Sequence, residues 1–310
     1  MSTGILSFHY ALMEQFLINA SALKRLASPI HILVCTLLWS LTSNSALAQT
    51  KSDAESVHRM ATGEPQRIVS LDFCTDISLM LLVSPARIAA LTERSFDPQF
   101  SPLALKAQGF ESHSGSIEEI IRLKPDLILA GDSHSELISA LKQMHYPVIN
   151  LKKATSLSDI APRTRELGQL TETNAQADEL LKQFQRLMRS AKKTVTNRSK
   201  RALIYAPNGT TTGAKTFKNE LLQHIGLRNV AAELGIIEQG QLGVEQLLRV
   251  QPDLLLIDDA ARNKNSLAQQ FNDHPALRGL SNTQKVNVHS GLWDCATPLA
   301  AKLATQLAKY

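Results

Sequence analysis

The chain has 310 residues, of which 33 are basic and 28 acidic, so its formal net charge at neutral pH is +5. This charge is too small to indicate a nucleic-acid-binding protein, and three cysteines are too few for a disulfide-rich scaffold. With 44% hydrophobic residues, a chain of this length can form two domains of ordinary size, each with its own core.

The N-terminal region has the order of features found in a secretory signal peptide. Lys24 and Arg25 precede an apolar run over residues 30–41, and Ala46 and Ala48 supply the small side chains that a signal peptidase requires. We therefore predict a signal peptide that is cleaved after Ala48. The apolar run is short for a membrane span, so a transmembrane anchor is the less favoured alternative.

Removal of residues 1–48 lowers the net charge to +4 and leaves a polar stretch without periodicity, residues 49–66. We expect this stretch to be a flexible leader. Cys35 lies inside the apolar run and lacks the small residue that precedes a lipidated cysteine, so we expect a soluble exported protein. The basic pair is far from Met1, which leaves Met13 as an alternative start.

Two segments 127 residues apart have closely similar sequences, residues 117–130 (IEEIIRLKPDLILA) and residues 244–257 (VEQLLRVQPDLLLI). Each consists of a short amphipathic pattern, a Pro-Asp turn and a wholly apolar run. The first predicts a helix and the last predicts a strand buried on both faces of a parallel sheet. The repeat therefore indicates one βα unit that is used twice.

The repeat extends upstream of these segments. Residues 67–71 and 201–205 are strand-like runs that lead through a polar loop into a pattern typical of a helix. We predict these two helices over residues 76–82 and 216–225. The sequence thus predicts an α/β fold with two similar Rossmann-like lobes.

Residues 173–197 connect the two predicted lobes, residues 67–172 and residues 198–310. Within this connection, residues 173–195 contain no Gly or Pro, and their apolar residues recur at the spacing of one helical face. These are Ala177, Leu180, Leu181, Phe184, Leu187, Met188 and Ala191. A helix of this length spans roughly 35 Å. We expect one long rigid helix that joins the lobes, with a ligand cleft between them.

Together, the cleavable signal, the two repeated lobes, the rigid connecting helix and a glutamate at the start of each repeat resemble the periplasmic substrate-binding proteins of ABC importers for iron-siderophore, haem and cobalamin ligands. The resemblance extends over about residues 67–307. Its strongest motif is the doublet Ser116-Ile-Glu118 and Gly243-Val-Glu245. The resemblance implies that Glu118 and Glu245, one on each lobe, dock against arginines of a permease dimer in the inner membrane. The alternative is that each acid complements a helix dipole.

The same resemblance implies a monomer in the periplasm that binds its ligand between the lobes. Ligands of open α/β sheets bind at the carboxyl ends of the strands, in loops that precede helices. The expected ligand-binding residues are Asp72, Phe73, Cys74, Thr75, Arg94, Ser133, His134, Tyr205, Asn208, Trp293, Asp294 and Cys295. Those with short polar side chains are equally suited to capping helices.

Cys74 and Cys295 are expected on opposite walls of the cleft, each at the start of a helix, where the thiolate is favoured. We expect both thiols to face the ligand and to contact a soft metal centre or the metal of a chelate. The alternatives are two unconnected thiols and a disulfide between the lobes. A disulfide needs Cα atoms within about 7 Å, and a cleft that admits a chelate is expected to hold them farther apart.

Arg94 is the one clear cation in the expected cleft loops, and its guanidinium suits a carboxylate or catecholate. Few aromatic residues are available to stack on a macrocycle. We therefore expect a charged iron chelate of the siderophore type, with cobalamin, a corrinoid, as the alternative. Haem is a weaker third, with Tyr205 and His134 as candidate axial ligands. The histidines are scattered, so we favour a chelate over a bare metal ion and expect no resident cofactor or metal.

Two motifs resemble those of enzymes but lack the remaining machinery. Residues 209–216 (GTTTGAKT) differ from a phosphate-binding loop because Ala214 replaces a glycine. Ser133, in the motif Gly131-Asp-Ser-His134, lacks a histidine base held by an acid. We therefore expect no enzymatic activity. A periplasmic ligand-sensing module is the other alternative, because it would use the same cleft and the same surface glutamates.

Overall fold

The computed structural model describes residues 63–194, 199–258, 275 and 279–310. The predicted signal peptide, its cleavage site and most of the predicted leader lie outside these residues. Residues 64–66, the end of the predicted leader, contact the first lobe. Arg87 forms an ion pair with Glu64, and its Nε donates to the carbonyl oxygen of Pro65 at 2.6 Å. None of the described helices is long and apolar enough to cross a lipid bilayer.

The first lobe contains a five-stranded parallel sheet in the order β3-β2-β1-β4-β5. Its strands are β1 (Ile68–Ser70), β2 (Ile88–Thr92), β3 (Glu111–His113), β4 (Leu127–Ala130) and β5 (Val148–Asn150). Its helices are α3 (Phe73–Leu82), α4 (Ala104–Ala107), α5 (Ile117–Arg122), α6 (Ser135–Gln143) and α7 (Ile160–Leu170). Two short 3₁₀ turns are η2 (Pro85–Arg87) and η3 (Glu93–Phe96).

The second lobe has a four-stranded parallel sheet in the order β11-β10-β6-β8, and a separate antiparallel pair, β7 and β9. Its strands are β6 (Arg201–Tyr205), β7 (Thr210–Thr212), β8 (Arg228–Asn229), β9 (Gln239–Gln241), β10 (Leu254–Asp258) and β11 (Gln284–Val288). Its helices are α9 (Phe217–His224), α10 (Val230–Glu233), α11 (Val244–Val250) and α13 (Ala300–Leu307), and its 3₁₀ turns are η4 (Pro207–Gly209) and η7 (Ser290–Leu292).

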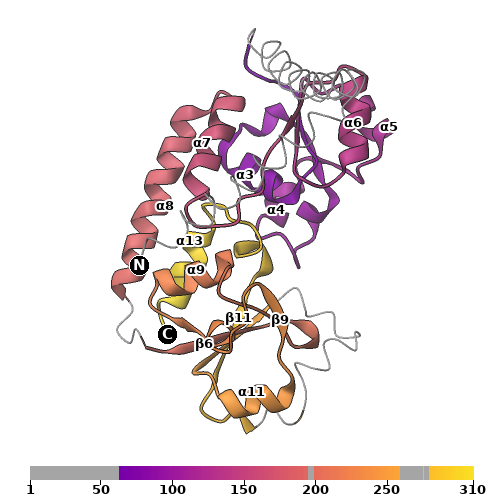
Figure 1. Cartoon of the computed structure of the whole chain (residues 1–310). Coiled ribbons are helices and arrows are strands. Elements are labelled where there is room, and N and C mark those ends of the chain that lie inside the picture. Colours follow the sequence, from indigo (N-terminus) through magenta and orange to yellow (C-terminus); the bar gives the residue numbers. More distant parts are fainter. Residues whose placement is uncertain (1–62, 195–198, 259–274, 276–278) are drawn as a thin grey trace, which may run out of the picture. The chain divides into compact units, whose positions relative to one another are not determined.

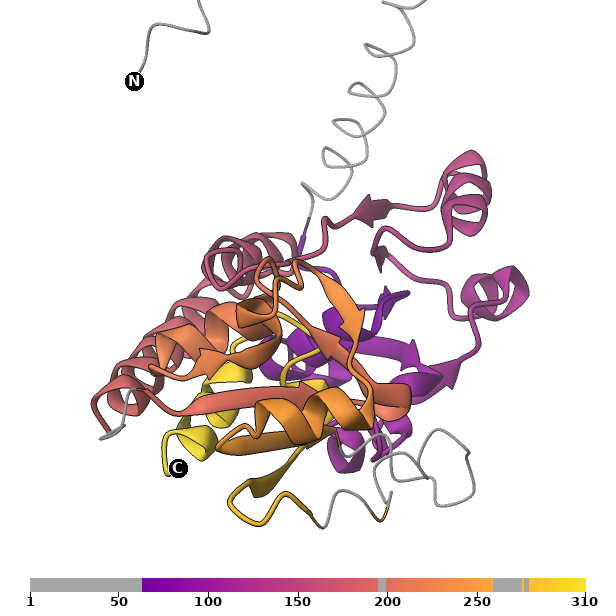
Figure 2. The same cartoon turned by 60° about the horizontal axis from the view of Figure 1, so that its bottom comes forward.

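Both predicted apolar strands are buried on both faces, as expected for parallel sheets covered by helices. In β4, Leu127 and Leu129 face one core cluster while Ile128 faces another. The same alternation in β10 divides its residues between two clusters. Helices α5 and α6 lie on one face of the first sheet and α7 lies on the other (Figure 1). Figure 2, which is turned by 60° from Figure 1, shows the same arrangement of these helices about the first sheet.

The aspartate of each repeated Pro-Asp turn holds the start of the neighbouring strand. Asp126 accepts the backbone N–H of Arg67 at 2.8 Å, and Asp253 accepts that of Arg201 at 2.7 Å. The guanidinium groups of these two arginines in turn donate to carbonyl oxygens at the ends of α5 and α11. The repeat therefore reflects one hydrogen-bonding arrangement that is used in both lobes.

The connecting helix is α8 (Asn174–Thr194), within the predicted range. It packs along α7 and α13, as Figure 1 shows. Near its start, Ala177 lies in the core of the first lobe, whereas Met188 and Ala191 lie in the core of the second. One apolar stripe therefore contributes to both cores. Helix α7, which contains Pro162, was not predicted from the sequence.

Candidate ligand-binding cleft

A cleft of about 830 Å³ is lined by residues from both lobes. It lies beyond the carboxyl ends of β1, β4 and β5, where ligands of parallel sheets bind. The lining residues are 72–75, 78, 94, 131–133, 151, 153–155, 163, 212, 215–218, 238–239 and 293–297. Of the ligand-binding residues predicted from the sequence, those in the cleft are Asp72, Phe73, Cys74, Thr75, Arg94, Ser133, Trp293, Asp294 and Cys295.

Cys74 and Cys295 form a disulfide, so the prediction of two ligand-facing thiols is wrong. Their Cα atoms are 5.3 Å apart, closer than we expected for residues on opposite walls. The cause is direct packing between the lobes: Ile77 of α3 lies in one apolar cluster with Cys295 and Leu299. Both cysteines still line the cleft, but neither offers a thiolate to a metal.

Tyr205 and Asn208 do not line the cleft. Because side chains alternate along β6, Tyr205 points into the core of the second lobe, where it is fully buried and its hydroxyl donates to the carbonyl oxygen of Leu242. Burial raises the pKa of Tyr205 to about 12. Asn208 is exposed in η4 with a φ of 59°. Tyr205 is therefore excluded as an axial ligand for haem.

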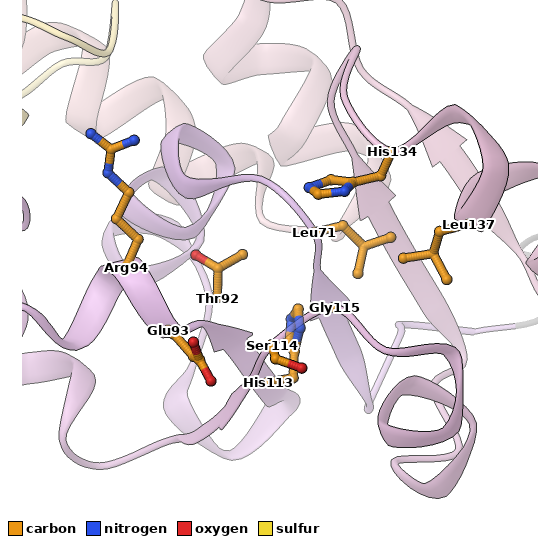
Figure 3. Close-up of a pocket in the computed structure, with 9 residues that line it drawn as sticks. All are labelled: Leu71, Thr92, Glu93, Arg94, His113, Ser114, Gly115, His134 and Leu137. Carbon is orange, nitrogen blue, oxygen red and sulfur yellow. The ribbon is translucent and has the colours of Figure 1, made fainter.

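His134 lines a second, smaller pocket of about 200 Å³, which Figure 3 shows. This pocket includes His113 and shares Arg94 with the cleft. The ring of His113 is fixed because its Nε2 lies 2.7 Å from the carbonyl oxygen of Ser70, and burial lowers the pKa of this histidine. His134 itself occupies the N-cap position of α6 with a φ of 68°, and its side chain forms no capping hydrogen bond among the described residues. The prediction that His134 lines the main cleft is therefore wrong.

Arg94 lies between two aromatic rings in the first lobe. The centre of its guanidinium is 5.1 Å from the ring centroid of Phe73 and 4.5 Å from that of Phe100. Such cation–π contacts hold the guanidinium but leave its N–H groups available to a ligand. Among the described residues, Arg94 forms no ion pair with a carboxylate.

The second lobe also places a cation against an aromatic ring. The Nζ of Lys218 lies 4.7 Å from the ring centroid of Trp293 and 2.8 Å from Oδ1 of Asp294. All three residues line the cleft. Trp293 is only 2% exposed, and its indole N–H has no hydrogen-bond partner among the described residues. The wall of this lobe thus combines a buried ring with a neutralised charge pair.

Two further lysines line the cleft and were missed by sequence analysis. Lys153 follows β5 in the first lobe, and Lys215 precedes α9 in the second. Within the described part of the chain, neither side chain is paired with a carboxylate. Asp72, Asp132 and Glu238 also line the cleft without an ion pair among the described residues, so three positive and three negative side chains there are unpaired. Lys215 belongs to residues 209–216, where we considered only a phosphate-binding loop. Lys153 follows a strand that we did not predict.

Asp72 and Thr75 have capping roles as well as lining the cleft. One carboxylate oxygen of Asp72 accepts both the backbone N–H and the hydroxyl of Thr75 at 2.9 Å. This N-cap begins α3 at Phe73, three residues earlier than predicted. The other carboxylate oxygen of Asp72 approaches Gly131, where a Cβ would lie 3.1 Å from it. Asp72 therefore shapes the cleft wall even without contacting a ligand.

Glu118 and Glu245 are both exposed in the first turns of α5 and α11. Neighbouring residues provide the capping interactions. Ser116 accepts the N–H of Glu119 in α5, and Gln246 accepts the N–H of Gly243 in α11. Among the described residues, neither Glu118 nor Glu245 accepts a hydrogen bond or forms an ion pair. The two carboxylates are therefore available at the surface, one on each lobe.

Asp76 is a buried acid in α3 that sequence analysis treated only as the start of a helix. Its side chain is 0% exposed, and its Oδ2 accepts hydrogen bonds from the backbone N–H of Thr92 at 3.0 Å, from the Thr92 hydroxyl, and from the Ser95 hydroxyl at 2.7 Å. Desolvation by burial outweighs these bonds and raises the pKa of Asp76 to about 7.

The raised pKa of Asp76 predicts stability that falls as pH rises. Between its unfolded pKa near 4 and its folded pKa near 7, the folded state binds more protons than the unfolded state. This group should therefore lower the free energy of unfolding by roughly 3 kcal/mol between pH 5 and pH 8. Asp76→Asn should lack this loss, as measured by urea denaturation at both pH values. Equal pH dependence in the two proteins would show that Asp76 titrates normally.

The sequence family described as "Periplasmic binding protein" matches this chain over residues 68–290. The uncharacterized ABC transporter substrate-binding lipoprotein YvrC of Bacillus subtilis is 25% identical over 228 residues, which are 69% of this chain and 70% of that protein. The vitamin B12-binding protein of Pectobacterium carotovorum is 27% identical over 203 residues, which are 62% of this chain and 71% of that protein.

The fold is also similar to solved structures. A possible iron-binding (periplasmic solute-binding) protein from Staphylococcus epidermidis superposes with a TM-score of 0.65. The match covers 79% of this chain and 98% of that chain, at 20% sequence identity. At this identity the similarity shows a shared two-lobe fold, and it leaves the ligand to be argued from the cleft.

Proposed function

This chain belongs to the periplasmic binding protein family and is the substrate-binding component of an ABC importer, and we propose that its substrate is an anionic ferric chelate of the siderophore type. Three cations of the cleft wall carry this proposal. Arg94, Lys153 and Lys215 come from both lobes and lack carboxylate partners among the described residues. Such cations suit the carboxylate or catecholate oxygens that surround iron in a chelate.

The size of the cleft supports the same proposal. A volume of about 830 Å³ lies within the range of sites that bury most of a small organic ligand. Phe73 and Phe217 add apolar lining beside the cations. A charged chelate offers both surfaces, because its organic arms are apolar while its metal-binding groups are anionic. We place the mature protein in the periplasm as a monomer, where it delivers this ligand to a permease dimer through Glu118 and Glu245.

Tryptophan fluorescence tests the ligand class. Trp39 lies in the predicted signal peptide, so Trp293, which lines the cleft, is the only tryptophan of the mature chain. We expect ferric dicitrate or a ferric catecholate to quench this fluorescence at micromolar concentrations, and cyanocobalamin and haemin to bind at least tenfold more weakly. Native mass spectrometry and an absorption spectrum of protein purified from the periplasm should show an iron-containing adduct.

Charge-removing variants connect this result to the cleft. Lys153→Gln combined with Lys215→Gln should weaken binding of the ferric chelate by about tenfold or more, since each charge-assisted contact contributes on the order of 1 kcal/mol or more. Lys285→Gln, at an exposed position of β11, serves as the control and should bind normally. Equal binding by all three proteins would refute the role assigned to the cleft cations.

A corrinoid is the second candidate, favoured by the similarity to a vitamin B12-binding protein. Trp293, Phe73 and Phe217 provide its apolar contacts in the cleft. This alternative makes the opposite prediction for the same experiment: cyanocobalamin would bind most tightly, and removal of the two lysine charges would leave its affinity within about threefold of the parent.

A further inference from the structure

Asp76 supports the backbone of the segment that carries Arg94. The three hydrogen bonds accepted by its Oδ2 come from Thr92 and Ser95, the residues on either side of Glu93 and Arg94. Ser95 is itself fully buried. The 3₁₀ turn η3 is therefore held from inside the lobe, while the Arg94 side chain extends from it into the cleft.

Helix α3 also contacts the side chain of Arg94, through Phe73. Phe73 precedes Asp76 by three residues, so the two side chains lie about one helical turn apart. The Phe73 ring contacts the guanidinium of Arg94, while the Asp76 carboxylate holds its backbone through Thr92 and Ser95. Helix α3 therefore fixes both the backbone of Arg94 and the position of its guanidinium.

The other ring that contacts Arg94 is that of Phe100, and the second lobe packs against the loop that carries it. The Nε2 of His289 lies 3.0 Å from the carbonyl oxygen of Pro98, and the Ser290 hydroxyl donates to that of Gln99 at 3.2 Å. A Cβ on Gly291 would lie 2.3 Å from the carbonyl oxygen of Phe100, so only glycine permits this approach. The loop that carries Phe100 is thereby packed against η7.

We propose that Asp76 is a positioning residue that holds Arg94 ready in the cleft before the ligand arrives. Asp76 itself touches no ligand, because it is fully buried beneath η3. An arginine that is already oriented loses less conformational freedom on binding, which raises affinity without adding a contact. This inference rests on the proposed function only in assigning a ligand to Arg94, since the contacts that hold Arg94 are all made by the protein itself.

The position of Arg94 can be measured without any ligand. In a ¹H–¹⁵N spectrum of arginine side chains, the Nε–H of Arg94 should be shifted by the two aromatic rings, and Arg94→Lys assigns this signal by removing it. We expect Asp76→Ala to move the signal to the region of mobile arginines. Asp76→Asn keeps an oxygen to accept the same hydrogen bonds and should retain the shift.

Two further variants keep the test decisive. Thr171→Val removes buried hydrogen bonds in the connection between α7 and α8, and its Arg94 signal should stay in place. If Asp76→Ala does not fold, Thr92→Val combined with Ser95→Ala removes both hydroxyl donors and should move the signal instead. An unchanged Arg94 signal in folded Asp76→Ala, or in the folded Thr92→Val and Ser95→Ala double variant, would overturn the proposal.

Binding of ferric dicitrate separates this inference from the proposed function. We expect Asp76→Ala to bind this probe about tenfold more weakly than the parent, and Asp76→Asn to bind within about threefold. A moved Arg94 signal in a protein whose parent does not bind ferric dicitrate would leave the positioning role intact and count against this ligand. Tight binding by both proteins, with an unmoved signal, would overturn the positioning role alone.

Discussion

Replacing Cys74 and Cys295 together by serine is expected to lower the free energy of unfolding of the mature chain by about 2 to 5 kcal/mol. The disulfide joins residues separated by 221 positions, and closing so long a loop removes much conformational entropy from the unfolded chain. The loop-entropy estimate for this length is about 5 kcal/mol, and measured values are often smaller. Urea denaturation of the parent and the double variant measures the difference.

The parent protein under reducing conditions provides the matched control. Dithiothreitol should bring its denaturation midpoint to that of the double serine variant and should leave the variant unchanged. Thiol titration of the native mature protein should find no reactive thiol before reduction and two after it. Two reactive thiols in the untreated protein would contradict the disulfide and restore the two thiols as candidate metal ligands.

The same variant tests how far the lobes are restrained. Helix α8 contributes to both cores, and the disulfide joins α3 of the first lobe to residues near α13 of the second. We expect small-angle scattering profiles of the parent with and without ligand to nearly superimpose, because a continuous helix bends less than a loop hinge. A larger ligand-dependent change in the serine variant would assign part of this restraint to the disulfide.

Glu118→Ala combined with Glu245→Ala is expected to abolish uptake while leaving ligand affinity unchanged. Both carboxylates are exposed, and neither has a partner among the described residues, so their removal should not disturb the fold or the cleft. If each contact with the permease contributes about 1 kcal/mol, loss of both weakens docking by roughly 30-fold. Uptake of labelled ligand by cells and fluorescence titration of the purified protein measure the two effects separately.

Glu136→Ala is a suitable control for this experiment, since Glu136 is also an exposed acid in the first turn of a helix. It should support normal uptake. Charge reversal at both docking positions, Glu118→Lys with Glu245→Lys, should be at least as severe as removal, because repulsion then replaces attraction. Loss of ligand affinity in the alanine variant would show instead that the two glutamates act in the structure of the cleft.

Much of the fold follows from local patterns in the sequence. Residues 127–130 and 254–257 are apolar at every position and follow a Pro-Asp turn, which favours strands buried on both faces, and the structure confirms them as β4 and part of β10. The apolar stripe over residues 173–195 likewise predicted a connecting helix, and the structure adds that this helix, α8, contributes to the cores of both lobes. These features were predictable because burial follows the period of each element.

The cleft was less predictable, because it depends on which residues of distant segments meet. Position after a strand correctly placed Asp72, Arg94 and Trp293 in the cleft. It misplaced Tyr205, because one residue along a strand changes the face on which a side chain lies. Lys153 was missed because β5, the strand that precedes it, was not predicted. The hydrogen bonds from Thr92 and Ser95 to Asp76 were also unpredictable, because no local pattern connects these residues.

The two-lobe α/β architecture, the connecting helix and the pair of surface glutamates could be predicted from the chain alone, because each depends on local periodicity or on an internal repeat. The disulfide between Cys74 and Cys295 and the surroundings of Arg94 depend instead on contacts between segments that are distant in the sequence. Whether two cysteines 221 positions apart form a disulfide depends on a Cα separation of 5.3 Å, which is set by packing between the lobes. The environment of a charged group is likewise set by neighbours that are remote in sequence.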